Sequence, residues 1–473
     1  MADPGPTQNT SSPPTLRISE DWLANIIGGS LLLISLLSVL TVLSRQEMKA
    51  GESALLQDEA IVNPLQDLFM KPIRWTGSPL DSWRGSDAGL SWSGILGTFA
   101  TLLFVLGVGV RFQGQSWLDF ARGFVFVFLL ALVALTIAAN TVVKQYNLEY
   151  ALWALTVGLL ISNTVGTPAL IKPAVLTEFY IKTGLVLYGA KVLFSTLLQL
   201  GLPGLCVAWI VTPIVLISTY WFGQKVLRIS SQRLNIVISA DMSVCGVSAA
   251  IATAAACRAN KEELTLAIGI SLSFTVVMMV LMPLIARLVG MDEIVAGAWI
   301  GGTIDSTGAV GAAAEMISPA AGSAAITIKL IQNVLIGVLA FGVALYWVRK
   351  VEPNHEGDTP DAGEIWRRFP KFVLGFLAAS ILFSIVHVLP RGPEIVGATL
   401  KGVTETLRSW LFAMAFVSIG LASNFRELSK TLQGGKPLLL YVCGQTLNLC
   451  LTLVMSWLMF TKLFPAAGRG LVD

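Results

Sequence analysis

Hydrophobic segments long enough to cross a bilayer recur along this chain, and no other sequence feature constrains its fold as strongly. We find about 13 of them, and one crossing needs roughly 20 apolar residues. Charged residues make up only 13% of the 473 residues, whereas soluble domains average about a quarter. We therefore expect an all-α polytopic membrane protein. The composition excludes a soluble enzyme, and a formal net charge of +3 gives no reason to expect a nucleic-acid partner.

The hydrophobic pattern also predicts the organisation of the chain. The segments lie near 22–44, 92–110, 120–140, 151–171, 176–199, 203–224, 232–258, 263–289, 294–317, 322–348, 368–390, 405–424 and 436–461. We divide the chain into a polar tail (1–21), three N-terminal transmembrane helices (22–145, with a polar loop at 45–91), a first five-helix repeat (146–290) and a second (291–465, with a linker at 349–367).

Orientation and localisation follow from the loops. Lys and Arg are more numerous on the side of the N-terminus, which predicts a cytoplasmic N-terminus in a multi-pass inner-membrane protein. The first apolar run, 22–44, is longer than the roughly 7–15 residues of a secretory signal, so we expect it to be retained as a helix.

The sequence offers little material for cofactor chemistry. The 5 cysteines form no C-x-x-C pair, and the chain has only 2 histidines. No phosphate-binding loop is present, which makes an ATP-driven pump improbable. We expect no resident cofactor.

Four small-residue patches interrupt the apolar segments. I-S-N-T-V-G-T at 161–167 resembles I-G-G-T-I-D-S at 300–306, and S-V-C-G-V-S at 243–248 resembles S-I-G-L-A-S at 418–423. The first pair lies in the first helix of each five-helix group and the second pair in the fourth. Because five crossings reverse the direction of entry, these matches predict an inverted repeat with discontinuous helices that cross each other.

An interrupted helix leaves backbone groups that lipid cannot satisfy, so such breaks face protein or water and can bind ions. The alternative explanation is close helix packing through small residues, which needs no ligand. For a single patch this alternative is the better one; the recurrence of four patches at matched positions favours binding.

Ionisable residues at bilayer depth are costly and therefore indicate function. Asp241 and Asp305 lie at two of the patches, where a carboxylate can take up a proton or bind Na⁺, and Lys191 and Lys329 are the basic candidates. The structural alternative is a salt bridge between these groups. The candidate substrate- and ion-binding residues are Asn163, Thr164, Lys191, Asp241, Ser243, Cys245, Gly246, Ser248, Thr303, Asp305, Ser306, Thr307, Lys329, Gln332, Ser418 and Gly420, with Na⁺ as the candidate metal near Asp241 or Asp305.

Five segments carry a family resemblance. They are L-V-L-Y-G-A-K at 185–191, M-S-V-C-G-V-S-A-A-I-A at 242–252, K-E-E at 261–263, W-I-G-G-T-I-D-S-T at 299–307 and K-L at 329–330. Over about 150–460 the chain resembles the YeiH-type family, whose proposed activity is sulfate export. The resemblance implies a ten-helix core of two inverted five-helix repeats, similar to bile acid:sodium symporters and sodium/proton antiporters, and an elevator-like movement.

The chain departs from that family at the expected site. Asp305 and Ser306 stand where the family has His-Asp, and Gln332 stands where it has Arg. Asp241 replaces a small residue, and Lys191 replaces an arginine. The site has lost basic groups and gained carboxylate character, which puts sulfate itself in doubt.

We expect a secondary active transporter, an exporter of a small anion such as sulfate, another sulfur oxyanion or a sulfonate, coupled to H⁺ or Na⁺. The expected partners are the lipid bilayer, the anion and a second copy in a homodimer. Two alternatives are an anion channel or passive pore and an intramembrane enzyme that uses Asp241 and Asp305. We expect no enzymatic activity, because the chain has no protease motif.

Overall fold

The computed structural model describes residues 18–50, 61–84, 91–145, 150–192, 194–351, 366, 370–423 and 435–467. This part of the chain is almost entirely helical and contains no strand beyond one isolated bridge between Trp75 and Asn140. Within it, 7 helices are long and apolar enough to cross a bilayer, and shorter apolar helices accompany them. The expectation of an all-α polytopic membrane protein is confirmed at this level.

In chain order, the α-helices are α1 (Glu20–Ala50), α2 (Trp92–Phe112), α3 (Trp117–Ala138), α4 (Thr141–Gln145), α5 (Tyr150–Thr164), α6 (Thr177–Gly189), α7 (Phe194–Lys225), α8 (Gln232–Ser243), α9 (Val247–Cys257), α10 (Lys261–Leu288), α11 (Glu293–Thr303), α12 (Thr307–Glu315), α13 (Pro319–Tyr346), α15 (Phe372–Val388), α16 (Gly392–Thr399), α17 (Glu405–Ala422) and α19 (Lys436–Trp457). Short 3₁₀ turns cover Gln66–Leu68, Pro79–Trp83 and Lys172–Ala174, and π-helical turns cover Trp347–Val351, Leu400–Thr404 and Leu458–Leu463.

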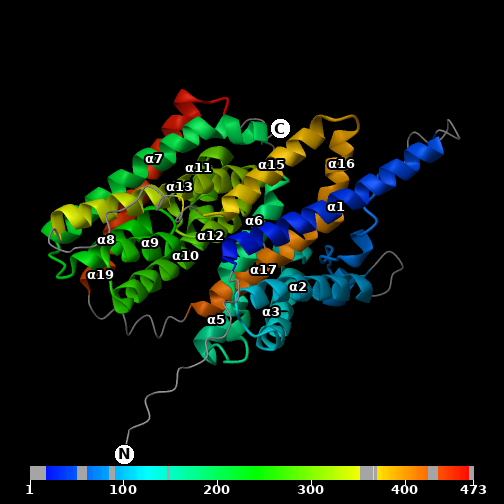
Figure 1. Cartoon of the computed structure of the whole chain (residues 1–473), viewed down its shortest axis with the longest axis horizontal. Coiled ribbons are helices and arrows are strands. Elements are labelled where there is room, and N and C mark those ends of the chain that lie inside the picture. The colour runs from blue at the N-terminus through cyan, green and yellow to red at the C-terminus, as the bar shows by residue number, and fades with distance from the viewer. Residues whose placement is uncertain are drawn as a thin grey trace, which may run out of the picture.

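The helices gather into two bundles that lie side by side (Figure 1). The hairpin bundle comprises α7–α13 and α19, and the flanking bundle comprises α1–α6 and α15–α17. Apolar side chains fill most of the boundary, as where Ile181 of α6 meets Gly308 of α12. Polar contacts also cross it: Arg408 of α17 pairs with Glu315 of α12 at 2.8 Å, and the Tyr188 and Ser323 hydroxyls lie 3.1 Å apart.

The segment at 232–258 differs from the sequence expectation. We expected one interrupted helix that crosses the bilayer. Instead the chain reverses over Val244–Gly246, and α9 runs back beside α8. Ile236 in α8 shares a buried cluster with Cys257 at the end of α9, and Ser231, the N-cap of α8, hydrogen-bonds Glu263 in the first turn of α10. Both ends of this first hairpin therefore lie on the same face of the bundle.

The segment at 294–317 forms a second hairpin. The chain reverses over Ile304–Ser306, and the ends meet where Ser318 donates to Glu293 at 2.6 Å. The long helix α13 then runs beside both arms. A hydropathy pattern cannot distinguish a hairpin from an interrupted helix that crosses the bilayer, since both consist of two apolar stretches separated by small residues.

The two hairpins enter from opposite faces. Helix α10 connects the end of the first hairpin to the start of the second, and its 28 residues rise about 42 Å. Asn260 begins this helix with a capping box, and Asp292 caps the helix α11 that follows it. The expected crossing of two discontinuous helices is thus corrected to two opposed hairpins whose tips meet inside the protein.

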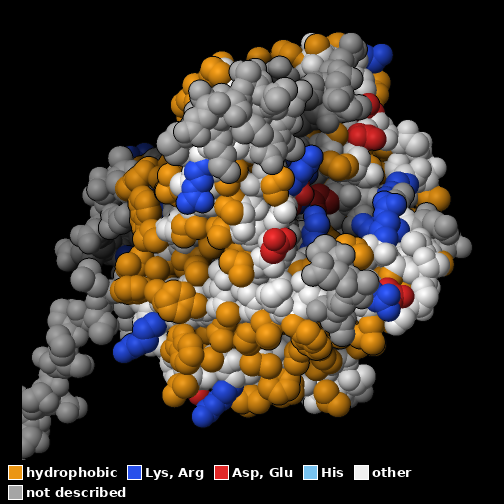
Figure 2. Space-filling view, turned by 90° about the vertical axis from the view of Figure 1, so that its right-hand side faces the viewer, with side chains coloured by type: hydrophobic (Ala, Val, Ile, Leu, Met, Phe, Trp, Pro, Cys, Tyr) orange, Lys and Arg blue, Asp and Glu red, His pale blue; other side chains and the backbone are white. Residues whose placement is uncertain are grey.

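The surface fits a lipid environment. Figure 2 shows one end of the molecule, where charged side chains gather over the middle of the face and apolar side chains form continuous areas along its sides. Large apolar residues on several long helices are exposed, among them Leu37, Phe104 and Ile217. Such areas are favourable against hydrocarbon and unfavourable against water.

Candidate functional site at the hairpin tips

Each tip consists of three residues, and the two tips are in contact. Gly246 has φ +60°, a backbone conformation that L side chains rarely adopt. A Cβ atom added there would lie 3.2 Å from the Asp305 carbonyl oxygen and 3.1 Å from the Ser271 hydroxyl. Glycine therefore allows both the reversal of the first tip and its close approach to the second.

The tips expose backbone carbonyls, and side chains of α13 bind several of them. The Lys329 ammonium donates to the Val244 carbonyl and, at 2.8 Å, to the Gln332 side chain. The Gln332 amide in turn donates to the carbonyls of Ser243 (3.0 Å) and Gly302 (3.2 Å). Helix α13 thus donates hydrogen bonds to both hairpins, near the C-terminal ends of their first arms, α8 and α11.

Helix α19 completes this shell from the other side. Its Gln445 amide donates to the Thr303 carbonyl at 3.0 Å, and its Asn448 amide donates to the Met242 carbonyl at 3.1 Å. A buried carbonyl without a hydrogen-bond partner costs free energy. These side-chain amides therefore stabilise the interrupted helices by supplying donors that water would otherwise have to supply.

The two carboxylates at the tips are buried but incompletely paired. Asp241 is 0% and Asp305 1% exposed. One oxygen of Asp305 accepts from the Tyr441 hydroxyl and, at 3.4 Å, from Ser271. Within the described residues, the other oxygen of Asp305 and both oxygens of Asp241 have no hydrogen-bond partner. Such orphaned acceptors require a proton or a cation for charge balance.

The charges at the tips interact with one another. Asp241 lies close enough to Asp305 for electrostatic repulsion, and Lys329 is close enough to Asp305 for attraction. The two carboxylates nevertheless share no hydrogen bond, since Asp241 has no partner among the residues that the structure describes. An aspartic dyad for hydrolysis holds one shared proton between carboxyl groups about 3 Å apart. Among the described residues, no hydrogen bond of this kind joins Asp241 to Asp305.

Helix polarity adds a further element. The second arm of each hairpin, α9 and α12, begins at its tip, so both helix N-termini point toward the contact. Helix N-termini carry a partial positive charge and free N–H groups that favour anions, whereas the C-termini of α8 and α11 present carbonyls that favour cations. The tip contact thus combines donors for an anion with acceptors for a cation.

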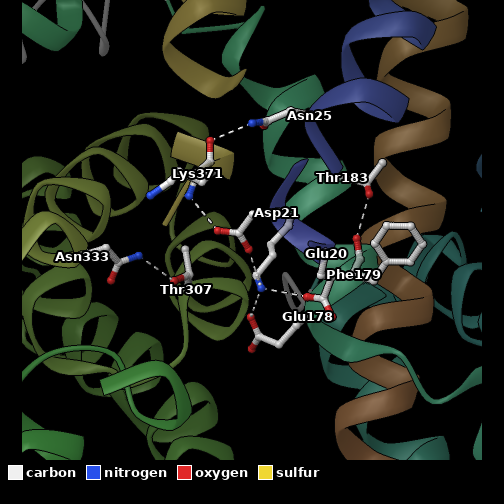
Figure 3. A network of polar contacts seen from close by, with 10 residues as sticks. Glu20, Asp21, Asn25, Glu178, Phe179, Thr183, Thr307, Asn333 and Lys371 are labelled. Atoms are coloured by element: carbon white, nitrogen blue, oxygen red, sulfur yellow. Dashed lines mark hydrogen bonds and ion pairs between the residues drawn. The ribbon is translucent and has the colours of Figure 1, made fainter. Parts of the chain in front are cut away.

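A cleft of about 600 Å³ lies beside α9, whose N-terminus begins at the first tip. Ser248, in the first turn of α9, lines its inner end, and Lys182 of α6 and Lys371 lie along its wall. Lys182 pairs with Glu20 at 2.8 Å and Asp21 at 2.9 Å. Figure 3 shows this ion-pair cluster and, nearby, the hydrogen bond that Asn333 of α13 donates to Thr307 at the start of α12 in the second hairpin. The cleft therefore lies between the two bundles, with a mostly apolar lining that includes a few polar and charged side chains.

The other two small-residue patches meet each other away from the tips, at the ends of α5 and α17. The Ser162 hydroxyl donates to the Gly420 and Ser423 carbonyls, each at 2.9 Å. A Cβ at Gly420 would lie 2.5 Å from the Leu155 carbonyl oxygen. This contact is the close packing through small residues that the sequence left as the alternative explanation.

The structure thus separates the sequence candidates into groups. It brings together at or beside the tips Asp241, Ser243, Cys245, Gly246, Ser248, Thr303, Asp305, Ser306, Thr307, Lys329 and Gln332. It places Asn163, Thr164, Ser418 and Gly420 at the α5–α17 contact. Lys191 lies just beyond the C-terminus of α6, 5.9 Å from the Tyr188 ring, near the Glu315–Arg408 pair.

Some of the polar side chains around the tips are absent from the candidates that the sequence predicted. Tyr441, Gln445, Asn448 and Thr452 lie at spacings of four, three and four residues, so they form one polar stripe along the apolar helix α19. That stripe is readable in the sequence. Asn333, which follows Lys329 and Gln332 within about one turn, is likewise readable as polar lining, whereas Ser271 carries no comparable signal.

Fold and site together define a multi-pass helical membrane protein with paired hairpins around buried charges. Residues 122–441 match the family model described as "Conserved hypothetical protein 698". A UPF0324 membrane protein of Rhodopirellula baltica is 59% identical over 85% of this chain and 73% of its own length. The chain belongs to this UPF0324 family of membrane proteins.

Other relatives extend the comparison. A UPF0324 membrane protein of Nitratidesulfovibrio vulgaris is 56% identical over 76% of the chain, but the match spans only 62% of that protein. The inner membrane protein YeiH of Escherichia coli is 26% identical over 56% of the chain and 71% of its own length. The family resemblance expected from the sequence is thus confirmed. No solved structure matches the chain.

Proposed function

We propose that this protein is a secondary active transporter that exports a small anion in exchange for, or together with, H⁺ or Na⁺. The carrying observation is the contact between two opposed hairpin tips that hold two buried, incompletely paired carboxylates beside Lys329. Interrupted helices near the bilayer midplane, with binding groups on the unwound backbone, are a recurrent design of secondary transporters.

The carboxylates are the cation half of the proposed mechanism. With Lys329 charged, ionisation of both Asp241 and Asp305 leaves one uncompensated negative charge in a buried site. A proton or Na⁺ taken up from one side of the membrane balances that charge. Loss of the ion on the other side restores the imbalance, so occupancy can drive the conformational change.

The anion half rests on the two helix N-termini and on the cleft. An oxyanion in the cleft can meet Ser248 in the first turn of α9, whereas the Lys182 ammonium on the wall is already paired with Glu20, Asp21 and Glu178. Sulfate, another sulfur oxyanion or a sulfonate fits these donors, because each oxygen can accept from a backbone N–H or hydroxyl group. The nearby carboxylates repel an anion, and a coupled H⁺ or Na⁺ offsets this repulsion.

The arrangement in two bundles supports an elevator-like movement. Apolar side chains form most of the boundary between them, and such a surface can slide with little change in hydrogen bonding. The Glu315–Arg408 pair and the Tyr188–Ser323 contact are the polar groups that a sliding movement would have to exchange.

Equivalent helix pairs support the inverted repeat. Helix α6 packs on α15 and α17, while α13 packs on α7 and α9, and α15 packs on α16 as α7 does on α8. These pairs match if α5 corresponds to α11–α12, α6 to α13, α7 to α15, and α8–α9 to α16–α17. The proposed five-helix repeats at 146–290 and 291–465, preceded by three helices, then each contain one hairpin, but the two hairpins occupy different positions in the repeat.

Transport by purified protein in liposomes tests the proposal. We expect uptake of radiolabelled sulfate, sulfite or a short sulfonate that saturates and depends on an imposed H⁺ or Na⁺ gradient. Asp305→Asn, Asp241→Asn and Lys329→Ala should each abolish it while the protein still elutes as a monodisperse species. Asp119→Asn, an exposed carboxylate at the start of α3, is the matched control and should transport normally.

Two outcomes contradict the proposal. Normal transport by all three variants would remove the tips from the mechanism. Unsaturable conductance with no dependence on either gradient would point to a passive pore instead.

A further inference from the structure

A second cavity lies apart from the tips and the cleft, on the lipid-facing side of the hairpin bundle. It has a volume of about 790 Å³ and is formed by the ends of α7 and α13 and the start of α8. We call it the α7–α13 groove. The residues that line it include Ile217, Gln224, Lys225, Val338 and Tyr346.

The groove changes from apolar to polar along its length. Ile217 and Lys225 are eight residues apart on α7, as are Val338 and Tyr346 on α13, which corresponds to about 12 Å along each helix. The inner part is apolar, and the outer rim carries Gln224, Lys225 and the aromatic ring of Tyr346. Aromatic and basic side chains at this level mark the boundary between hydrocarbon and headgroups.

The rim contains a donor without an acceptor. The side-chain amide nitrogen of Gln224 is buried and has no hydrogen-bond partner within the described residues. A buried donor of this kind costs free energy unless an acceptor outside the chain supplies the bond. The phosphate or ester oxygens of a lipid are acceptors available at this depth.

The charge around the rim is positive. Lys225 lies on the groove itself, and the exposed residues Arg228, Arg349 and Lys350 follow directly after α7 and α13 on the same side. Basic groups close to a membrane surface attract anionic lipids. The groove therefore combines an apolar floor, an unpaired donor and a positive rim in the order in which a phospholipid presents its chain, its ester groups and its phosphate.

We propose that the α7–α13 groove is a binding site for one anionic phospholipid of the surrounding bilayer. An acyl chain lies along Ile217 and Val338, the Gln224 amide donates to a lipid oxygen, and Lys225 pairs with the phosphate. Since Gln232 and Ile236 of the first hairpin also line the groove, the bound lipid supports α8 from the side that faces away from the tips.

Thermal unfolding of the purified full-length chain in mild detergent tests this site, with phosphatidylglycerol or phosphatidylcholine added as probe. We expect phosphatidylglycerol to raise the melting temperature more than phosphatidylcholine, since ligand binding stabilises the folded state. Native mass spectrometry should show one retained phosphatidylglycerol per chain.

Two variants assign the effect to the groove. Gly342 lines the groove and has open space at its Cβ position, so Gly342→Phe fills the groove without a clash in the helix. It should lose most of the shift and the retained lipid. Gly29→Phe on α1, whose Cβ position is also open, is the matched control and should behave as wild type. Lys225→Gln should lose the preference for the anionic lipid.

Three results would overturn the proposal. They are an equal shift with both lipids in the wild type, an undiminished shift in Gly342→Phe, and an undiminished anionic preference in Lys225→Gln. The assay measures binding rather than transport, so failure of the proposed transport function would leave its outcome unaffected.

Discussion

The contact between the hairpin tips and the contact between α5 and α17 are both made by small residues. They differ in which polar groups remain without hydrogen-bond partners. At α5–α17, Ser162 and Asn163 donate to backbone carbonyls across the contact, and glycine brings the two helices close together. At the tips, Gly246 brings the chains together in the same way, but the carboxylates of Asp241 and Asp305 retain orphaned oxygens.

The difference shows what converts close packing into an ion site. Small residues alone let helices approach, and their hydroxyl and amide groups then satisfy the nearby backbone. A site arises only where the approach also buries charge that the protein balances incompletely. Lys329 lies beside two buried carboxylates at the tips, and in the proposed mechanism a further proton or cation balances the second of them.

The largest expected effect comes from the buried ammonium. Lys329→Met should lower the free energy of unfolding by about 3–5 kcal/mol, because it leaves buried carboxylates without their counter-charge. Chemical denaturation in detergent measures this loss, and the exposed residue Lys172 offers the control Lys172→Met. The double variant with Asp305→Asn should recover part of the stability. A loss as small as that of the control would show that Lys329 does not compensate the carboxylates.

A substitution that pushes α5 and α17 apart should have the next largest effect on stability. Gly420→Ala should lower the free energy of unfolding by about 1–3 kcal/mol, because its Cβ must push α5 away. Transport per folded molecule should remain near wild type. The control Gly397→Ala places a Cβ in open space on α16 and should be neutral. A Gly420→Ala protein that is stable but inactive would contradict a purely structural role for this contact.

The tip glycine should show the opposite balance. Gly246→Ala forces a positive φ outside the left-handed α region on alanine, at a cost of about 1–3 kcal/mol, and presses on the second tip. We expect transport per folded molecule to fall far more than stability does. Liposome uptake normalised to the folded fraction, measured by tryptophan fluorescence, separates the two effects. Unchanged uptake would remove the tip contact from the mechanism.

The smallest expected effect concerns a single hydroxyl. Ser162→Ala removes the single hydroxyl proton that lies between the Gly420 and Ser423 carbonyls and should cost about 0.5–1.5 kcal/mol. The substrate concentration at half-maximal uptake should not change. A large change in that concentration would place Ser162, and with it the α5–α17 contact, in the binding site.

The sequence predicts the helices and the charged centre better than it predicts the path of the chain. The seven described helices that are long enough to cross a bilayer coincide with predicted hydrophobic segments, but α5 ends at Thr164 inside the segment 151–171, and the segment 176–199 is divided between α6 and the start of α7. The residues Asp241, Asp305 and Lys329 lie close together. The hairpins could not be foreseen, because the direction of a chain after a break depends on contacts such as Ser231 with Glu263 that are distant in sequence. The division of the four patches into one ion site and one packing contact likewise depends on which helices become neighbours.

The shell around the tips has a consequence for the order of assembly. Tyr441, Gln445 and Asn448 all lie on α19, so the tips are completed by a helix synthesised just over two hundred residues after the first hairpin begins. Until α19 inserts, the Met242 and Thr303 carbonyls lack their amide partners and Asp305 lacks its phenol. Insertion of α19 is therefore the step at which these buried groups gain their partners, so the centre of the protein is completed late in biogenesis.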